Sequence, residues 1–268
     1  MRIFAVILFL FSLAAASVPQ AVPPPQQGPG VGPAPAPDAG VDAARYATAY
    51  EIAQLFDPFD LSLTGGQFAF GNALQTSVAA QPGGSIFLAK YPGIVEAVSD
   101  AAKPLLQEQL SKLMPRVWAI RANLYAKNMS SAELAQAKRF MESRAGRAFI
   151  AAAFANMKME SGLASIVKNP EAGVSAKDMF SDSQSAGVRA FRSLSPQDRA
   201  AITAFSGSVV GRKMSSLNPE YVKAAMVVAN ESDPAFAARF VAVISSTISD
   251  FVKKADAARA QASQSTAF

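Results

Sequence analysis

Apolar side chains recur every three or four residues through most of this chain, and the breaks fall at proline and glycine. Residues 42–56 follow this spacing and stop at Asp57-Pro58. Residues 67–80 begin after Gly65-Gly66 and end before Pro82-Gly83-Gly84. Because this period places apolar residues on one face of a helix, each stretch is predicted to be helical.

The middle of the chain continues the pattern. Residues 94–113 carry apolar side chains at helical intervals, and Pro104 is expected to kink this helix or divide it in two. Residues 117–127 continue helically. No segment alternates apolar and polar residues as a half-buried strand does. The pattern predicts an all-α, multi-helix bundle.

One passage occurs twice, at residues 129–147 and, diverged, at residues 194–212. In the first copy Ser130 precedes Glu133 by three residues, an arrangement in which each side chain caps a free amide of a helix start. The second copy has Ser195, then Pro196 at the first helical position, then Asp198. Both copies therefore predict a helix start at the same place.

Each copy also contains a second predicted helix start. Ser143 precedes Gly146 by three residues, and Ser208 precedes Gly211 in the same way. A serine cap with a glycine that admits a close neighbour predicts a helical hairpin in each copy, near residues 121–157 and 189–223. One continuous helix with its glycine on a crowded face is the alternative. Phe140 and Phe205 are predicted to lie in the core.

An arginine follows each glycine, at Arg147 and Arg212. A guanidinium group binds carboxylates in bidentate fashion, so each arginine either closes an ion pair within its own unit or binds an external anion. The candidate internal partners are Glu133, Glu142 and Asp198. The candidate binding residues are the four cations that follow the corners, Arg144, Arg147, Arg212 and Lys213.

The net charge is +5, and residues 121–157 and 189–223 each hold six basic and two acidic residues. Side-by-side packing of the two units would make one positive surface, although a solvated basic face is the simpler interpretation. The expected partners are an envelope protein or an anionic envelope component such as lipid head groups, lipopolysaccharide phosphates or cell-wall carboxylates. The export signal argues against nucleic acid.

The amino terminus has the pattern of a secretory signal peptide at residues 1–16, with one positive charge, a short apolar run and an Ala-x-Ala end. The apolar run is too short to span a membrane. Residues 17–41 are rich in proline and glycine, which predicts a disordered tether. The helical domain is predicted at 42–254, followed by a flexible tail at 255–268. We therefore expect an exported protein, periplasmic or secreted, with no membrane span after cleavage.

The chain contains no histidine and no cysteine. Histidine-dependent triads, histidine-ligated zinc and thiolate chemistry are therefore excluded. Ser165 and Lys168 have the spacing of serine/lysine acyl enzymes, but the companion motifs are missing. Asp57 and Asp60 resemble paired carboxylates, although a helix-ending turn with Asp60 as a cap explains both. No catalytic residue, cofactor or metal is predicted, and a carboxylate-only hydrolase is the less favoured alternative.

The run from Leu124 to Leu134, continued by 140–147, resembles the bacterial domain-of-unknown-function family numbered 2059. The resemblance covers roughly residues 92–156, with Met141 and Arg144 where the family often has tyrosine and proline. It implies an exported helical bacterial protein and carries no catalytic residue.

Together these features predict a non-enzymatic binding module of the cell envelope. The alternative is a peripheral membrane or anionic-polymer binding protein, since residues 224–248 are heavily apolar.

Overall fold

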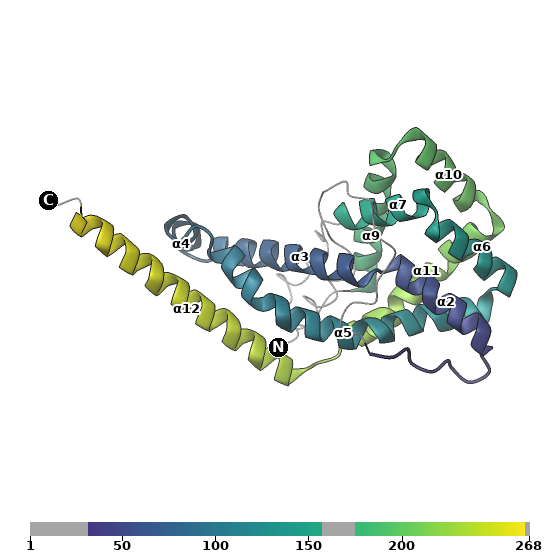
Figure 1. The fold of residues 1–268 in the computed structure, drawn as a ribbon, viewed down its shortest axis with the longest axis horizontal. Coiled ribbons are helices and arrows are strands. Elements are labelled where there is room, and N and C mark those ends of the chain that lie inside the picture. Colours follow the sequence, from purple (N-terminus) through teal and green to yellow (C-terminus); the bar gives the residue numbers. More distant parts are fainter. Residues whose placement is uncertain (1–31, 157–174, 266–268) are drawn as a thin grey trace.

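The fold is a bundle of α-helices around one long central helix, and no strand occurs within the residues described. The structure is a computed structural model that describes residues 32–156 and 175–265. The helices in chain order are α2 Ala43–Phe56, α3 Phe59–Ala79, α4 Gly84–Lys90, α5 Ile94–Asn128, α6 Ser131–Glu142, α7 Arg144–Ala155, α9 Ala176–Ser193, α10 Pro196–Gly207, α11 Val209–Ala229 and α12 Pro234–Ser265. Helix α5 contacts α2, α3, α11 and α12 (Figure 1). The all-α prediction is confirmed.

Three predictions concern other parts of the chain. The signal peptide at 1–16, most of the tether at 17–41, and the pair Ser165 and Lys168 lie outside the described residues.

Helix α2 begins and ends where the sequence predicts. The Asp42 side chain accepts a hydrogen bond from the Arg45 backbone N–H at 2.8 Å, which caps the first turn. The helix ends at Phe56, and the backbone of Asp57 is no longer helical, with φ −122° and ψ 70°. Pro58 causes this end, because a proline disfavours helical geometry in the residue before it.

Helix α3 contradicts the predicted break at Gly65-Gly66. It runs without interruption through both glycines, which are buried. Glycine disfavours a helix by only about 1 kcal/mol per residue, and packing of α3 against α5 and α7 offsets that cost. Asp60 is also not the helix cap. It lies inside the first turn, where a negative charge favours the helix dipole.

Helix α5 is continuous across Pro104 and Pro115, so the predicted division at Pro104 does not occur. The helix bends along its length (Figure 1). One face stays buried from end to end, which stabilises the helix although each proline removes a hydrogen bond. This buried face is formed by Val98, Ala102, Leu106, Leu110, Leu113 and Val117.

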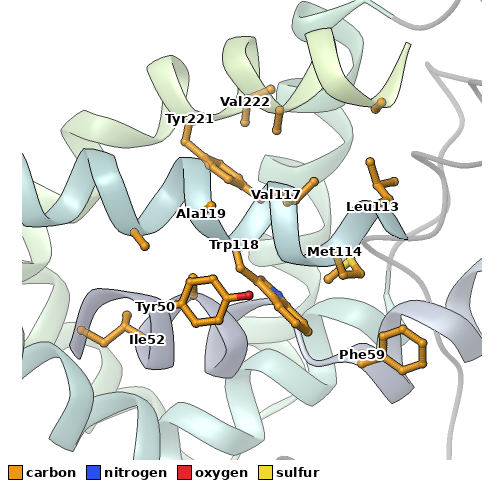
Figure 2. Close-up of a cluster of buried hydrophobic side chains, with 14 of the residues drawn as sticks. Tyr50, Ile52, Phe59, Leu113, Met114, Val117, Trp118, Ala119, Tyr221 and Val222 are labelled. Atoms are coloured by element: carbon orange, nitrogen blue, oxygen red, sulfur yellow. The ribbon is translucent and has the colours of Figure 1, made fainter. Parts of the chain in front are cut away.

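Trp118 on α5 lies at the centre of the core (Figure 2). Its ring meets the Tyr50 ring edge to face, with centroids 6.0 Å apart and an interplanar angle of 83°, a favoured aromatic geometry. The indole N–H donates to the Asp57 carbonyl at 3.0 Å. Tyr221 and Val222 of α11 approach from the other side of α5. The core thus joins α2, α5 and α11.

A charged residue continues the apolar face of α5. Arg121 follows Val117 by one helical turn and is only 3% exposed. Its guanidinium group is 3.0 Å from Asp57 Oδ2, and the Tyr221 hydroxyl donates to the same oxygen at 3.0 Å. The guanidinium carbon lies 3.6 Å from the Tyr221 ring centroid and 4.4 Å from that of Phe56. One buried cation therefore connects α5 to the α2–α3 junction and to α11.

The surroundings keep Arg121 charged. Burial has the largest single effect and lowers the pKa of Arg121. Asp57, Tyr221 and Tyr125 together outweigh it, so the pKa lies well above its ordinary value. Burial also raises the pKa of the Tyr221 hydroxyl; Arg121 opposes this shift and Asp57 adds to it. Tyr221 therefore remains a neutral donor to Asp57 near neutral pH. In the sequence Arg121 stands out only as one of the basic residues at 121–157, which does not indicate this role.

The chain before α2 is fixed to α5, although it belongs to the predicted tether. The Asp38 backbone N–H donates to Asn123 Oδ1 at 2.9 Å, and Lys127 Nζ lies 2.7 Å from Asp38 Oδ2. The Tyr46 hydroxyl donates to the Pro35 carbonyl at 2.8 Å. These bonds make residues 35–41 part of the folded body.

Helix α12 continues through most of the predicted tail and stays helical to Ser265. Contacts between distant segments hold its end: the Tyr91 hydroxyl donates to Asp256 Oδ2 at 3.0 Å, and the Arg259 guanidinium donates to the Lys90 carbonyl. By length and composition alone, the stretch Pro234–Ser263 could cross a membrane, with a mean hydropathy of 1.5 and 17% of its most apolar window buried.

We predict that Arg121→Met destabilises the protein by about 3–5 kcal/mol, because it leaves the Asp57 carboxylate buried without its cation. Arg116→Met is the matched control. Arg116 is half-exposed and pairs with Glu231 at 2.6 Å, and breaking an exposed pair costs less than about 1 kcal/mol. Urea unfolding followed by circular dichroism measures both. Equal losses in the two variants would contradict the structural role of Arg121.

We predict that the ion pair between Arg239 of α12 and Glu108 of α5 persists in acid. Hydrogen bonds from Arg239 and then from Lys112 lower the pKa of Glu108 to about 2. The stabilisation is complete above the ordinary carboxyl pKa of about 4.3 and is lost as the pH falls through about 2. Arg239→Gln should raise the Glu108 pKa more than Lys112→Gln does. Carboxyl NMR titration at low salt measures it; a wild-type midpoint at the ordinary value would refute the contact.

Candidate anion-binding surface

The two copies of the repeated passage form two helical hairpins, α6–α7 and α10–α11. Both lie at the end of the molecule opposite the carboxyl end of α12 (Figure 1). Ser130 and Glu133 form the predicted capping box: the Ser130 backbone N–H donates to Glu133 Oε2 at 2.7 Å, and the Glu133 backbone N–H donates back to the serine hydroxyl oxygen at 3.3 Å. The Ser195 hydroxyl oxygen accepts from the Asp198 backbone N–H at 3.1 Å. Both predicted helix starts are confirmed.

The corner inside each hairpin has the same geometry in both copies. Ser143 ends α6 and caps α7, accepting from the Gly146 N–H at 3.1 Å. Ser208 ends α10 and caps α11, accepting from the Gly211 N–H at 3.0 Å. The chain thus turns at each serine, and the alternative of one continuous helix is wrong.

Each corner requires a glycine, because the backbone of the preceding helix lies very close to its Cα atom. A Cβ atom on Gly146 would lie 2.1 Å from the Phe140 carbonyl oxygen, and one on Gly211 would lie 2.1 Å from that of Phe205. These distances are far shorter than van der Waals contact. Only glycine lets the second helix start this close to the end of the first.

The two hairpins meet through equivalent residues. The Phe140 and Phe205 rings stack with their centroids 3.8 Å apart and an interplanar angle of 1°. Each ring is half-buried and packs against the core rather than inside it. Because the stacked residues hold the same place in each copy, the two hairpins face each other across this contact.

Two ion pairs also join the two hairpins. Arg144 of the first hairpin lies 2.9 Å from Asp198 Oδ1 of the second. Lys213 of the second lies 2.9 Å from Glu133 Oε1 of the first. Lys213 and the Ser130 backbone N–H lower the pKa of Glu133. Arg144 and Lys213, both predicted binding residues, thus already hold the hairpins together.

Arg147 and Arg212, the other two predicted binding residues, have backbone partners. The Arg147 guanidinium donates to the Glu142 carbonyl, the last residue of α6, and Arg212 donates to the Gly207 carbonyl, the last residue of α10. The predicted carboxylate partners are engaged elsewhere, with Glu142 3.8 Å from Lys138 Nζ. The expectation of an internal ion pair at these arginines is therefore wrong.

Both arginines remain exposed while their guanidinium groups are held at the helix ends. Within the part of the chain that the structure describes, neither lies within ion-pair distance of a carboxylate. Arg139, in the last turn of α6, is exposed in the same way. The surface thus offers guanidinium groups that are fixed in place and open to an external anion.

The enzyme-like candidates do not form a paired carboxylate site. Asp57 is 4% exposed, and Arg121 and Tyr221 bind its carboxylate. Asp60 is exposed in the first turn of α3. Among the described residues, no group of three or more acidic, histidine or cysteine side chains is placed to hold a metal ion.

Comparison with known proteins adds no family. A scan against protein-family models found no match, and searches of curated proteins and of solved structures found none either. The resemblance to the family numbered 2059 therefore stays a prediction.

We predict that Gly146→Ala and Gly211→Ala each destabilise the protein by about 1–3 kcal/mol, the usual cost of forcing a methyl group into a packed contact. Gly207→Ala is the matched control, because a Cβ there meets nothing within 4 Å. That change should be neutral or stabilising by up to about 1 kcal/mol, since alanine is the better helix former. Urea unfolding compares the three variants; an unaffected Gly146→Ala protein would argue against the close corner.

Proposed function

We propose that this chain is an exported, non-enzymatic binding module whose paired basic hairpins contact an anionic component of the cell envelope. The observation that carries the proposal is the placement of Arg147 and Arg212. Both are exposed, both are anchored by a helix-end carbonyl, and neither is neutralised by a carboxylate among the described residues.

Anchoring favours binding because it reduces the conformational entropy that an arginine loses when it orders against a ligand. A guanidinium group presents five N–H donors, and one bond to a carbonyl leaves the others available for phosphate or carboxylate oxygens. The ion pairs Arg144–Asp198 and Lys213–Glu133 support this role indirectly, because they fix the two hairpins relative to each other.

The prediction is that the double variant Arg147→Gln, Arg212→Gln binds fluorescently labelled lipopolysaccharide about 30-fold more weakly than the wild type. Each cation near an anionic surface contributes roughly 1 kcal/mol to binding, and each 1.4 kcal/mol changes the affinity about tenfold. Fluorescence anisotropy at low and high salt measures the affinity.

The matched control is Lys253→Gln, Lys254→Gln. It removes the same charge from exposed positions on α12, at the other end of the molecule. Equal weakening in both double variants would mean that net charge alone drives the binding. Absence of wild-type binding to lipopolysaccharide, to soluble poly-glutamate and to anionic vesicles would refute the proposal.

A second candidate function, peripheral membrane binding, is favoured by the hydropathy of α12. The apolar stretch 224–248 is divided, because α11 ends at Ala229 and α12 begins at Pro234. Val241 of α12 is 49% exposed, whereas Phe236 and Phe240 pack inward. Loss of co-sedimentation with anionic vesicles in Val241→Asp, but not in the arginine double variant, would favour this candidate.

A further inference from the structure

A groove lies where the chain before α2 runs beside α5. Its volume is about 770 Å³. One wall is the extended chain at Gly32, Pro33 and Pro35, and the other is one face of α5 between Pro104 and Arg116. Much of this lining is proline, so its walls are largely apolar.

The α5 wall is formed by residues on one side of the helix. Pro104, Ser111 and Pro115 are spaced by seven and four residues, which places them on one side of the helix. Pro115 has no N–H, so the Ser111 carbonyl lacks its usual helical donor. The Ser111 hydroxyl donates to the Gln107 carbonyl at 2.8 Å. This wall therefore combines apolar proline rings with the hydroxyl group of Ser111.

The charged residues at the groove are already paired. Glu108 lies 2.8 Å from Lys112 and 2.8 Å from Arg239. Arg116 pairs with Glu231 at 2.6 Å. The groove thus offers no unpaired charge, which suits an uncharged occupant.

The chain upstream of α2 runs along α5 toward this groove. Asp38 is held beside Asn123 and Lys127, and six residues earlier Gly32 already lines the groove. From Asp38 back to Gly32, the chain therefore passes toward the amino-terminal half of α5. Gly32 thus brings the chain to one wall of the groove.

We propose that residues 18–31 of the same chain dock along this groove. They contain five prolines and no charge, which matches the apolar and charge-paired walls. At about 3.1 Å per residue in an extended proline-rich conformation they span roughly 43 Å. The α5 face from residue 104 to 116 is only about 18 Å long, so fewer than half of these residues fill it.

Docking costs little conformational entropy, because a proline-rich segment has few conformations to lose. Its backbone carbonyls have no internal hydrogen bonds and can accept from groove donors such as the Gln107 amide. On this proposal the segment is a strap on the folded body rather than a free tether.

Paramagnetic relaxation tests the proposal directly, because the chain has no cysteine and a single introduced one is unique. A nitroxide on Gln26→Cys should strongly weaken the amide NMR signals of Gln107, Glu108 and Ser111 in the exported protein. Signals of exposed α10 residues such as Thr203 should keep their intensity. The control label on Ser206→Cys, exposed on α10, should leave the α5 signals unchanged.

A second experiment uses a variant in which a large side chain fills the groove. Ser111→Trp should restore the α5 signals in the Gln26-labelled protein, and Gln107→Trp should do the same if the first variant folds poorly by circular dichroism. Weak, uniform loss of signal over the whole surface would overturn the proposal. Weakening that appears only when labelled protein is mixed with unlabelled ¹⁵N protein would also overturn it, because the occupant would then belong to a second copy.

Discussion

A charged arginine inside the core requires a fixed arrangement of three chain segments. Arg121 has lost most of its hydration, and the cost of that loss is offset only if a carboxylate and aromatic rings surround it. Asp57 from the α2–α3 junction and Tyr221 from α11 meet this requirement. The position of α11 relative to α5, and with it the position of the second hairpin, is therefore coupled to one buried ion pair.

The second hairpin completes the candidate binding surface. Once α11 lies against α5, Phe205 of the second hairpin stacks on Phe140 of the first. The ion pairs between the hairpins then use some of the basic residues of the repeated passage, while Arg147 and Arg212 stay exposed. Arg144 and Lys213 each lie within ion-pair distance of a carboxylate of the other hairpin. Among the described residues, Arg147 and Arg212 do not.

The strap proposed for residues 18–31 has the same physical basis as the rest of the molecule. Pro104 and Pro115 of α5 lack backbone N–H groups, and both lie on the face of α5 that lines the groove. An extended, uncharged segment can lie on such a face without presenting backbone N–H groups at each proline. The chain before α2 already follows this face as far as Gly32.

Local interactions could be predicted because both partners lie a few residues apart in the sequence. Ser130 with Glu133, and Ser143 with Gly146, show their geometry in the spacing alone. The break expected at Gly65-Gly66 was wrong for the opposite reason, since packing of α3 against distant helices offset a small local preference. The buried Arg121 had one available signal, its place in line with Val117 on the apolar face of α5, but charge counting obscured it.

By itself the sequence determined the helical class, the helix caps and the two corners, because hydrogen bonds within one turn decide them. Only the tertiary structure decided which charges pair and which remain exposed. Arg144 and Asp198, or Arg121 and Asp57, are separated by more than fifty residues, and nothing local brings them together. Packing of apolar faces does so, and it thereby leaves Arg147 and Arg212 as the open cations of this surface.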